Sequence, residues 1–398
     1  MAMGAMAGVG GVAVGTMVAN ICAYLIHLPA TRWLSPAEYG EFAVLLQAML
    51  VLGVPALALQ VVIAREVVRG RAVADLISIT VRTTAAVLVA AAVAVPVVMA
   101  VADTGLAATI AAFATAPLLV LIAAGQGILQ GGQRFSVLSW VLAGVGVART
   151  VPGVVALAAG AGAAGALTAT AVGAAIAAAV IWLIVLADKP ADSAISEGLA
   201  LRLVLHASQV QLVLIALSSV DLLAARPILG EYDAGVYALG TIATKAAFWL
   251  PQAIGVVLYP QLADVAKTAR ALRTAVGWLT AIAATVVVGA AICGPLVPVI
   301  AGEDYRPVAP ILWLFALTGS ALSVLQVGLL AAIARDRTWI GLLSWAVLAI
   351  EVVLVATVAH SIVSLAVIAA SCAVVGTVST LAALSVTRTQ DRGRTVDA

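Results

Sequence analysis

The chain is a succession of uncharged apolar runs, each long enough to cross a lipid bilayer. A membrane-spanning helix needs roughly 20 such residues, and backbone groups in lipid must be paired internally, so these runs are predicted to be helices. Hydrophobic residues make up 64% of the chain and charged residues 10%, which excludes a soluble globular protein. We predict an all-α polytopic membrane protein with about twelve spans, at residues 6–30, 37–64, 83–102, 105–130, 136–157, 165–187, 203–225, 234–260, 274–301, 308–334, 338–359 and 361–387.

The distribution of lysine and arginine predicts the orientation of these spans. Cytoplasmic loops of membrane proteins are enriched in basic residues. If the N-terminus is cytoplasmic, 15 of the 20 basic residues lie on the cytoplasmic side: Arg65, Arg69, Arg71, Arg82, Arg134, Lys189, Arg202, Lys267, Arg270, Arg273, Arg335, Arg337, Arg388, Arg392 and Arg394. Both termini are therefore predicted to be cytoplasmic, in a bacterial-type inner (plasma) membrane. The first span lacks a basic n-region and a cleavage site, so it is expected to be an uncleaved helix.

An internal repeat divides the chain into two halves. Residues 32–45 (RWLSPAEYGEFAVL) are echoed at 226–239 (RPILGEYDAGVYAL), and each copy places a glycine and then an alanine at the start of a long apolar run. We expect six-helix lobes at 1–190 and 191–387, joined through the polar stretch 188–202. A polar tail at 388–398, expected to be disordered, follows them. Repeated halves that enclose a midplane site are a recurrent plan of transporters.

The loops contain no sign of an enzyme. No outer loop is long enough for a catalytic domain, and the three histidines are scattered. There is also no phosphate-binding glycine loop and no nucleic-acid-binding module. Before the second span, Ser35, Pro36 and Glu38 are spaced as in a capping box, which predicts a sharp helix start at that point.

Polar side chains recur at helical spacing inside three spans. The first span carries Thr16, Asn20, Tyr24, His27 and Thr31 on one face; the eighth carries Tyr237, Thr241, Lys245 and Gln252; the seventh carries Gln211, Ser218 and Asp221. Polar groups facing lipid are costly, so these faces are expected to point at one another or at water. Hydrogen bonding between helices is the competing structural explanation.

Besides Glu38 and Glu41 near the start of the second span, four charged residues lie inside predicted spans. Lys245 and Asp221 belong to the polar faces above, and Glu351 is near the middle of the eleventh span. Arg149 lies in the outer half of the fifth span, where a snorkelling, structural role is expected. The sequence leaves two roles open for Glu351: it could belong to a cavity or cation site, or it could form a buried pair.

Four segments of the sequence resemble the polysaccharide (O-antigen type) flippase branch of the multidrug/oligosaccharidyl-lipid/polysaccharide exporter superfamily. They are RWLSPAEYGEFA (32–43), DLLAARPILGEYDAGVYAL (221–239), WLPQAIGVVLYPQLAD (249–264) and GEDYRPVAPIL (302–312). The resemblance implies two six-helix lobes around a V-shaped cleft lined by spans 1, 2, 7 and 8. It also implies outward transfer of a polyprenyl-pyrophosphate-linked oligosaccharide by alternating access, for cell-surface polysaccharide biosynthesis.

The resemblance assigns cleft roles to Arg32 and Lys245, which match basic positions that such flippases use. Together with the polar faces, the expected substrate-binding residues are Arg32, Lys245, Asn20, Tyr24, His27, Thr241 and Gln252. Related lipid II flippases place a sodium site among spans 7, 11 and 12, so Asp221 and Glu351 are expected to couple transport to Na⁺ or H⁺. Thr377 or Ser379 would complete the cation's shell. No resident cofactor is expected.

Two other functions are open from the sequence. The first is a cation-coupled small-molecule (multidrug) exporter of the same superfamily, which would share the fold. The second is a non-transporting membrane scaffold of a glycan-assembly complex, against which the charges Lys245, Asp221 and Arg32 argue. The expected partners are the lipid-linked glycan, membrane lipid and a polysaccharide polymerase or glycosyltransferases, with no nucleic acid.

Overall fold

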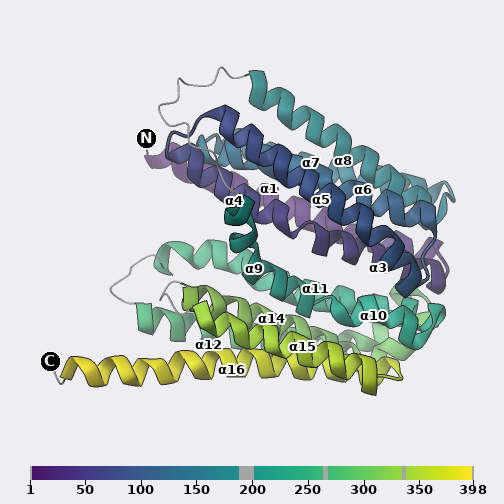
Figure 1. Ribbon diagram of the computed structural model, residues 1–398. Coiled ribbons are helices and arrows are strands. Elements are labelled where there is room, and N and C mark those ends of the chain that lie inside the picture. Colours follow the sequence, from purple (N-terminus) through teal and green to yellow (C-terminus); the bar gives the residue numbers. More distant parts are fainter. Residues whose placement is uncertain (1, 188–200, 263–267, 334–337, 397–398) are drawn as a thin grey trace. The chain divides into compact units, whose positions relative to one another are not determined.

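The computed structural model describes residues 2–187, 201–262, 268–333 and 338–396 (Figure 1). The chain forms two compact units, Met1–Leu212 and Val213–Ala398. Nearly all of the described residues are helical, and none of them forms a β-strand. The division between the units falls inside helix α9, after the polar stretch that we interpreted as a linker. Residues 188–200 of that stretch lie outside the described residues.

The first unit contains five spans preceded by a broken one. Its helices are α1 (Ala2–Leu25), α2 (His27–Trp33), α3 (Pro36–Leu52), α4 (Val54–Val68), α5 (Val73–Ala102), α6 (Leu106–Gly131), α7 (Phe135–Ala158) and α8 (Gly162–Ala187), and α9 (Leu201–Leu217) begins within it. Helix α7 packs along both α1 and α8, and α6 packs along α4 and α8. The apolar core of this unit has two parts, one where α4, α5 and α6 meet and one where α6, α7 and α8 meet.

The described residues of the second unit form five long helices and two short ones, α10 and α13, after the end of α9. They are α10 (Val220–Leu229), α11 (Glu231–Leu262), α12 (Thr268–Cys293), α13 (Val297–Ala301), α14 (Leu312–Ile333), α15 (Gly341–Val358) and α16 (Ile362–Val396). Three short 3₁₀ helices, Gly294–Leu296, Glu303–Ile311 and Thr338–Ile340, lie between them. Helix α14 packs along α11, α12 and α16.

The predicted all-α, multi-span architecture is confirmed. Within the described ranges, 11 helical segments are long and apolar enough to cross a membrane, and α11, with 32 residues, matches the remaining predicted span. One expectation was wrong: the tail at 388–398 was expected to be disordered, but α16 continues to Val396. The tail contains no proline, and its arginine and glutamine residues are good helix formers, so nothing in the sequence stops the helix at the end of the span.

The capping box before α3 is confirmed. The Ser35 hydroxyl accepts a hydrogen bond from the Glu38 amide at 3.3 Å, and the Glu38 carboxylate accepts one from the Ser35 amide at 3.0 Å. Pro36 occupies the first turn, where its missing N–H is not needed. The chain therefore turns sharply between α2 and α3.

The first span of each unit is interrupted. In unit 1 the break lies at Ile26, because Pro29 lacks the N–H that would bond to the carbonyl of Leu25. In unit 2 the break lies at Ser218 and Ser219, whose hydroxyl groups both donate to the carbonyl of Ile215 and so compete with the helix backbone.

Glycines allow the helices of unit 1 to approach closely. A side-chain carbon built on Gly146 of α7 would lie 2.6 Å from the Cα of Ala19 in α1. Carbons built on Gly127 and Gly131 of α6 would each lie 2.6 Å from backbone oxygens of α4. Van der Waals contact between backbones is a main source of helix association in membranes, so these small residues set the spacing of the helices.

Candidate transport site

A buried acid–tyrosine pair follows the helix break in unit 2. Asp221 lies in the first turn of α10, and its Oδ2 accepts a hydrogen bond of 2.6 Å from the hydroxyl of Tyr237 in α11. Both side chains are buried, and Oδ1 of Asp221 is fully enclosed. A carboxylate at a helix N-terminus is stabilised by the helix dipole, so α10 and Tyr237 together hold Asp221 inside the unit.

A second buried acid lies close to Asp221. Glu351 of α15 is 0% exposed, and neither of its carboxylate oxygens has a hydrogen-bond partner among the described residues. Glu351 lies within electrostatic range of Asp221 and of Cys372 in α16. The structure therefore brings together the two acids that the sequence placed on separate spans. An uncompensated buried carboxylate is costly, so a cation or proton would stabilise this pair.

Lys245 belongs to the same group of charges. It lies half-buried two turns after Tyr237 on α11 and contributes to the electrostatic field at Asp221. Thr241, between them, is 2% exposed and donates its hydroxyl hydrogen bond to the carbonyl of Ala238 in its own helix. Lys245 thus has an anionic neighbour inside unit 2. The side chain of Gln252 lies outside the described residues.

The two hydroxyl groups proposed to complete a cation shell are bonded to backbone. Thr377 donates to carbonyls of Ala373 and Ala321, each at 2.8 Å, and Ser379 donates to Gly376 at 3.1 Å. A hydroxyl binds a cation through its oxygen lone pairs, so these hydrogen bonds leave both groups able to bind one.

A matching contact follows the helix break in unit 1. His27 is the first residue of α2, and its Nδ1 shares a hydrogen bond of 3.1 Å with the hydroxyl of Tyr39 in α3. The ring also packs edge-on against Phe42. In both units, therefore, a titratable residue just beyond the break is bound to a tyrosine of the next span. His27 is 7% exposed, which places it inside the unit.

The remaining predicted residues of unit 1 are more accessible. Asn20 and Tyr24 of α1 are half-buried, and Arg32, in the last turn of α2, is exposed. Thr16 and Thr31 of the same face donate hydrogen bonds to carbonyls of their own helices. The polar face of the first span thus contains both internally bonded hydroxyl groups and accessible side chains.

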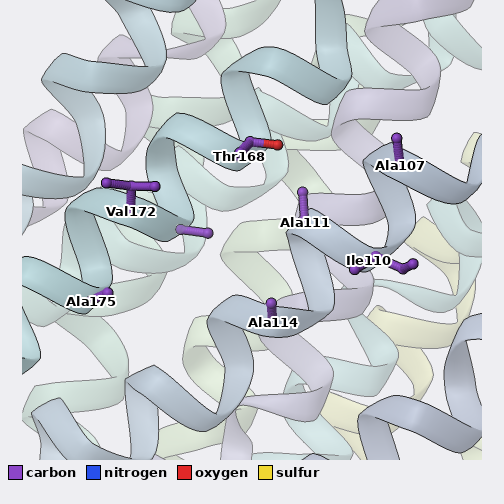
Figure 2. A pocket seen from close by; sticks show the side chains of 8 residues that line it. Ala107, Ile110, Ala111, Ala114, Thr168, Val172 and Ala175 are labelled. Carbon is purple, nitrogen blue, oxygen red and sulfur yellow. The ribbon is translucent and has the colours of Figure 1, made fainter.

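A shallow groove runs between α6 and α8 on the outside of unit 1 (Figure 2). It has a volume of about 410 Å³ and is lined by Ala107, Ile110, Ala111, Ala114, Thr168, Ala171, Val172 and Ala175. Thr168 donates its hydroxyl hydrogen bond to Ala164, so the lining offers almost no polar group. Its chemistry fits lipid acyl chains and does not fit a polar cargo.

The partners within these sites were not predicted from the sequence. Asp221 and Tyr237 were expected on the polar faces of two different spans but not as a pair, and Tyr39 was not among the expected site residues. The repeat does not indicate these pairs, because its two copies, aligned end to end, place Asp233 opposite Tyr39 and Ala43 opposite Tyr237.

Comparisons with known proteins show the fold. No protein-family model matches the chain, and no curated protein matches it. A solved inward-facing conformation of a multidrug resistance MATE family transporter of the MOP superfamily matches with a TM-score of 0.70 and 14% identity, over 94% of this chain and 96% of that one. The outward-facing conformation of such a transporter matches with a TM-score of 0.56 and 15% identity, over 96% of both chains.

A third solved structure has the same fold. It is a MOP superfamily transporter from Pyrococcus furiosus Vc1, described by a reverse polarity of its binding pocket that suggests a different function. It matches with a TM-score of 0.54 and 16% identity, over 95% of both chains. The chain therefore has the two-unit, all-helical fold of these transporters, and the matches cover nearly the whole of each chain.

Proposed function

We propose that the protein moves a polyprenyl-pyrophosphate-linked oligosaccharide outward across the membrane by alternating access. The proposal rests on the sign of the charges that are accessible to a cargo. Of the two basic residues expected to bind cargo, Arg32 is exposed and Lys245 half-buried. The acids Asp221 and Glu351 are 3% and 0% exposed. An anionic cargo fits these charges better than a cationic one.

The amphipathic nature of this cargo suits the rest of the site. Its glycan and phosphates need hydrogen-bonding side chains, such as those of Asn20 and Tyr24, whereas its polyprenyl tail can stay in lipid. The motifs shared with polysaccharide flippases agree with this cargo. None of the solved structures described above is named as a polysaccharide flippase, so the cargo is inferred from charges and motifs alone.

Multidrug export is the second candidate, and the comparisons support it better. Two of the three solved structures described above are named as multidrug resistance transporters. At 14–15% identity they establish the fold and leave the cargo open. An exporter of organic cations would need a carboxylate facing its cargo. Asp221 and Glu351 would have to become exposed in another conformation to provide one.

We propose that Asp221 and Glu351 couple transport to a Na⁺ or H⁺ gradient. A cation that binds more tightly in one conformation shifts the equilibrium toward that conformation. Asp221→Asn and Glu351→Gln should each flatten the dependence of transport on the gradient. If both variants keep the full dependence, the acids are structural partners and coupling occurs elsewhere.

One experiment separates the two cargo classes. In a host lacking the gene, lipid-linked glycan on the inner leaflet and susceptibility to cationic drugs are both measured, with wild-type protein and Lys245→Ala restored in turn. Glycan accumulation that wild-type protein reverses and Lys245→Ala does not, with membrane levels equal, supports flipping. Drug resistance restored without any change in the glycan would overturn it in favour of export.

A further inference from the structure

A buried carboxylate holds two arginines together where α4 meets α5. Glu66, in the last turn of α4, is 2% exposed. Its Oε1 accepts a hydrogen bond from Nη1 of Arg69, and its Oε2 accepts one from Nε of Arg71, each at 2.9 Å. Because both guanidinium groups contact one carboxylate, they lie close together. Arg71 balances the charge of Glu66, so Arg69 keeps a net positive charge for another anion.

The backbone of the turn has the conformation that this contact requires. Gly70 has a φ of 75°, a left-handed conformation that glycine adopts without strain. The chain therefore reverses at the end of α4, and the amide of Arg71 donates a hydrogen bond to the carbonyl of Glu66 at 3.1 Å. The positions of both arginines are thus fixed by the backbone as well as by the carboxylate.

This turn lies at the membrane surface. Helices α4 and α5 belong to the consecutive candidate spans Pro36–Val68 and Val73–Ala102, which residues 69–72 join. Helix α5 has 30 residues, so its length of about 45 Å exceeds the hydrocarbon core of a bilayer, which is about 30 Å thick. The turn therefore reaches the level of the lipid headgroups.

A third arginine and an apolar strip adjoin the pair. Arg65 lies one turn before Arg69 on α4; both are exposed, and Arg65 forms no ion pair or side-chain hydrogen bond within the described ranges. Leu57 and Val61, eight and four residues before Arg65, are 44% and 64% exposed, so they share its face of the helix. Like charges one turn apart repel each other. An anion that contacts both arginines would therefore be stabilising.

Membrane orientation alone does not account for this arrangement. The positive-inside rule needs basic residues on one side of the membrane but no fixed position for them. The turn between α6 and α7, which two spans place on the same side, carries Arg134 and no acid. The other acid near the α4–α5 turn, Asp75, lies in the first turn of α5, where the helix dipole stabilises a carboxylate.

We propose that Arg65 and Arg69 bind the headgroup phosphate of an anionic phospholipid, and that Glu66 is the residue that positions Arg69. The side chain of Arg69 is 52% exposed while it is bonded to Glu66, so part of its guanidinium fork is accessible to phosphate oxygens. An acyl chain of the same lipid would lie along Leu57 and Val61. The proposal does not depend on the cargo of the transporter.

The test measures phospholipid binding directly. Full-length protein in a neutral detergent is titrated with phosphatidylglycerol or phosphatidylcholine, and the bound lipids are counted by native mass spectrometry. We expect phosphatidylglycerol to bind more tightly, and Arg65→Gln and Arg69→Gln each to weaken its binding about fivefold. Arg202→Gln removes an exposed arginine of α9 in the same unit but outside the turn, and it should bind as wild type.

Glu66→Gln separates a positioned site from diffuse surface charge. The substitution makes the turn more positive by one charge, so diffuse attraction predicts tighter binding of phosphatidylglycerol. Release of Arg69 from its carboxylate predicts weaker binding, and this is the result we expect. If Glu66→Gln does not fold, Arg69→Lys takes its place, because it keeps the charge and loses the fork; it should also bind more weakly than wild type.

Several results would overturn the proposal. They are equal affinity for the two lipids, unchanged binding in Arg65→Gln and Arg69→Gln, and tighter binding in Glu66→Gln. A loss in Arg202→Gln as large as that in Arg65→Gln would assign the effect to diffuse charge. Farnesyl pyrophosphate tests the other kind of lipid phosphate. If it binds at these arginines and phosphatidylglycerol does not, the ligand is a prenyl pyrophosphate and the phospholipid site is rejected.

Discussion

Replacing Gly146 with alanine should force α1 and α7 apart. The new methyl carbon would lie 2.6 Å from the Cα of Ala19 and 3.2 Å from its Cβ. Carbon atoms pack best at about 3.5–4.0 Å, so the helices must separate by roughly 1 Å. The atom in the way belongs to the backbone and cannot rotate aside. Overpacking of this kind costs about 1–3 kcal/mol.

The matched control lies two residues away on the same helix. Gly144 has no heavy atom within 4 Å of an added Cβ, and alanine is the better helix former by about 1 kcal/mol. Each kcal/mol shifts the melting temperature of a unit of this size by about 2–4 °C. We expect purified Gly146→Ala to melt roughly 2–12 °C below wild type and Gly144→Ala to melt at or above it. Equal melting temperatures for the two variants would refute the close packing of α1 on α7.

Three further predictions concern polar side chains of the spans. Tyr237→Phe removes the hydrogen bond to Asp221 and should lower the stability of unit 2 by about 1.5–3 kcal/mol, measured by thermal melting. Glu66 accepts hydrogen bonds from two arginines, each at 2.9 Å, and is 2% exposed, so Glu66→Gln should lower the stability of unit 1 by about 1–3 kcal/mol. In a protein lacking its native cysteines, Asn20→Cys should react with a membrane-impermeant thiol reagent faster than His27→Cys, because Asn20 is the more exposed.

Exposed positions provide the controls for the first two. Tyr232→Phe removes an exposed hydrogen bond to Asp304, and Glu303→Gln removes an exposed ion pair. Both should change stability by less than about 1 kcal/mol. If Tyr237→Phe or Glu66→Gln lowers stability no more than its exposed control does, the buried hydrogen bonds removed by that substitution do not stabilise the unit. Equal reaction rates for the two cysteine probes would mean that the break in the first span opens in solution.

The sequence predicts the helices well because lipid leaves few alternatives. Every uncharged run became a helix, and the start of α3 followed from Ser35, Pro36 and Glu38, whose interactions are local. The breaks were not predicted. The one at Ile26 depends on a proline three residues later, and the one at Ser218 depends on hydroxyl groups competing for a single carbonyl. Such competition can be resolved only in three dimensions.

The candidate site was predicted less completely than the helices. Helical periodicity shows that Asp221 and Lys245 each lie on a polar face, but it cannot show which face meets which. The contact between Asp221 and Tyr237 depends on the break before α10, and the approach of Glu351 depends on how α15 packs.

The proximity of Asp221 and Lys245 also affects how the protein is made. A single aspartate or lysine at the centre of a span opposes membrane insertion by about 2.5–3.5 kcal/mol. These two residues lie on consecutive helices, α10 and α11, which meet at Gly230, a residue with φ of 83°. The two helices can therefore enter the bilayer as one hairpin that carries both charges, with Lys245 in the electrostatic range of Asp221. Neither charge then has to cross the hydrocarbon alone, and the order of the spans along the chain makes this pairing available during synthesis.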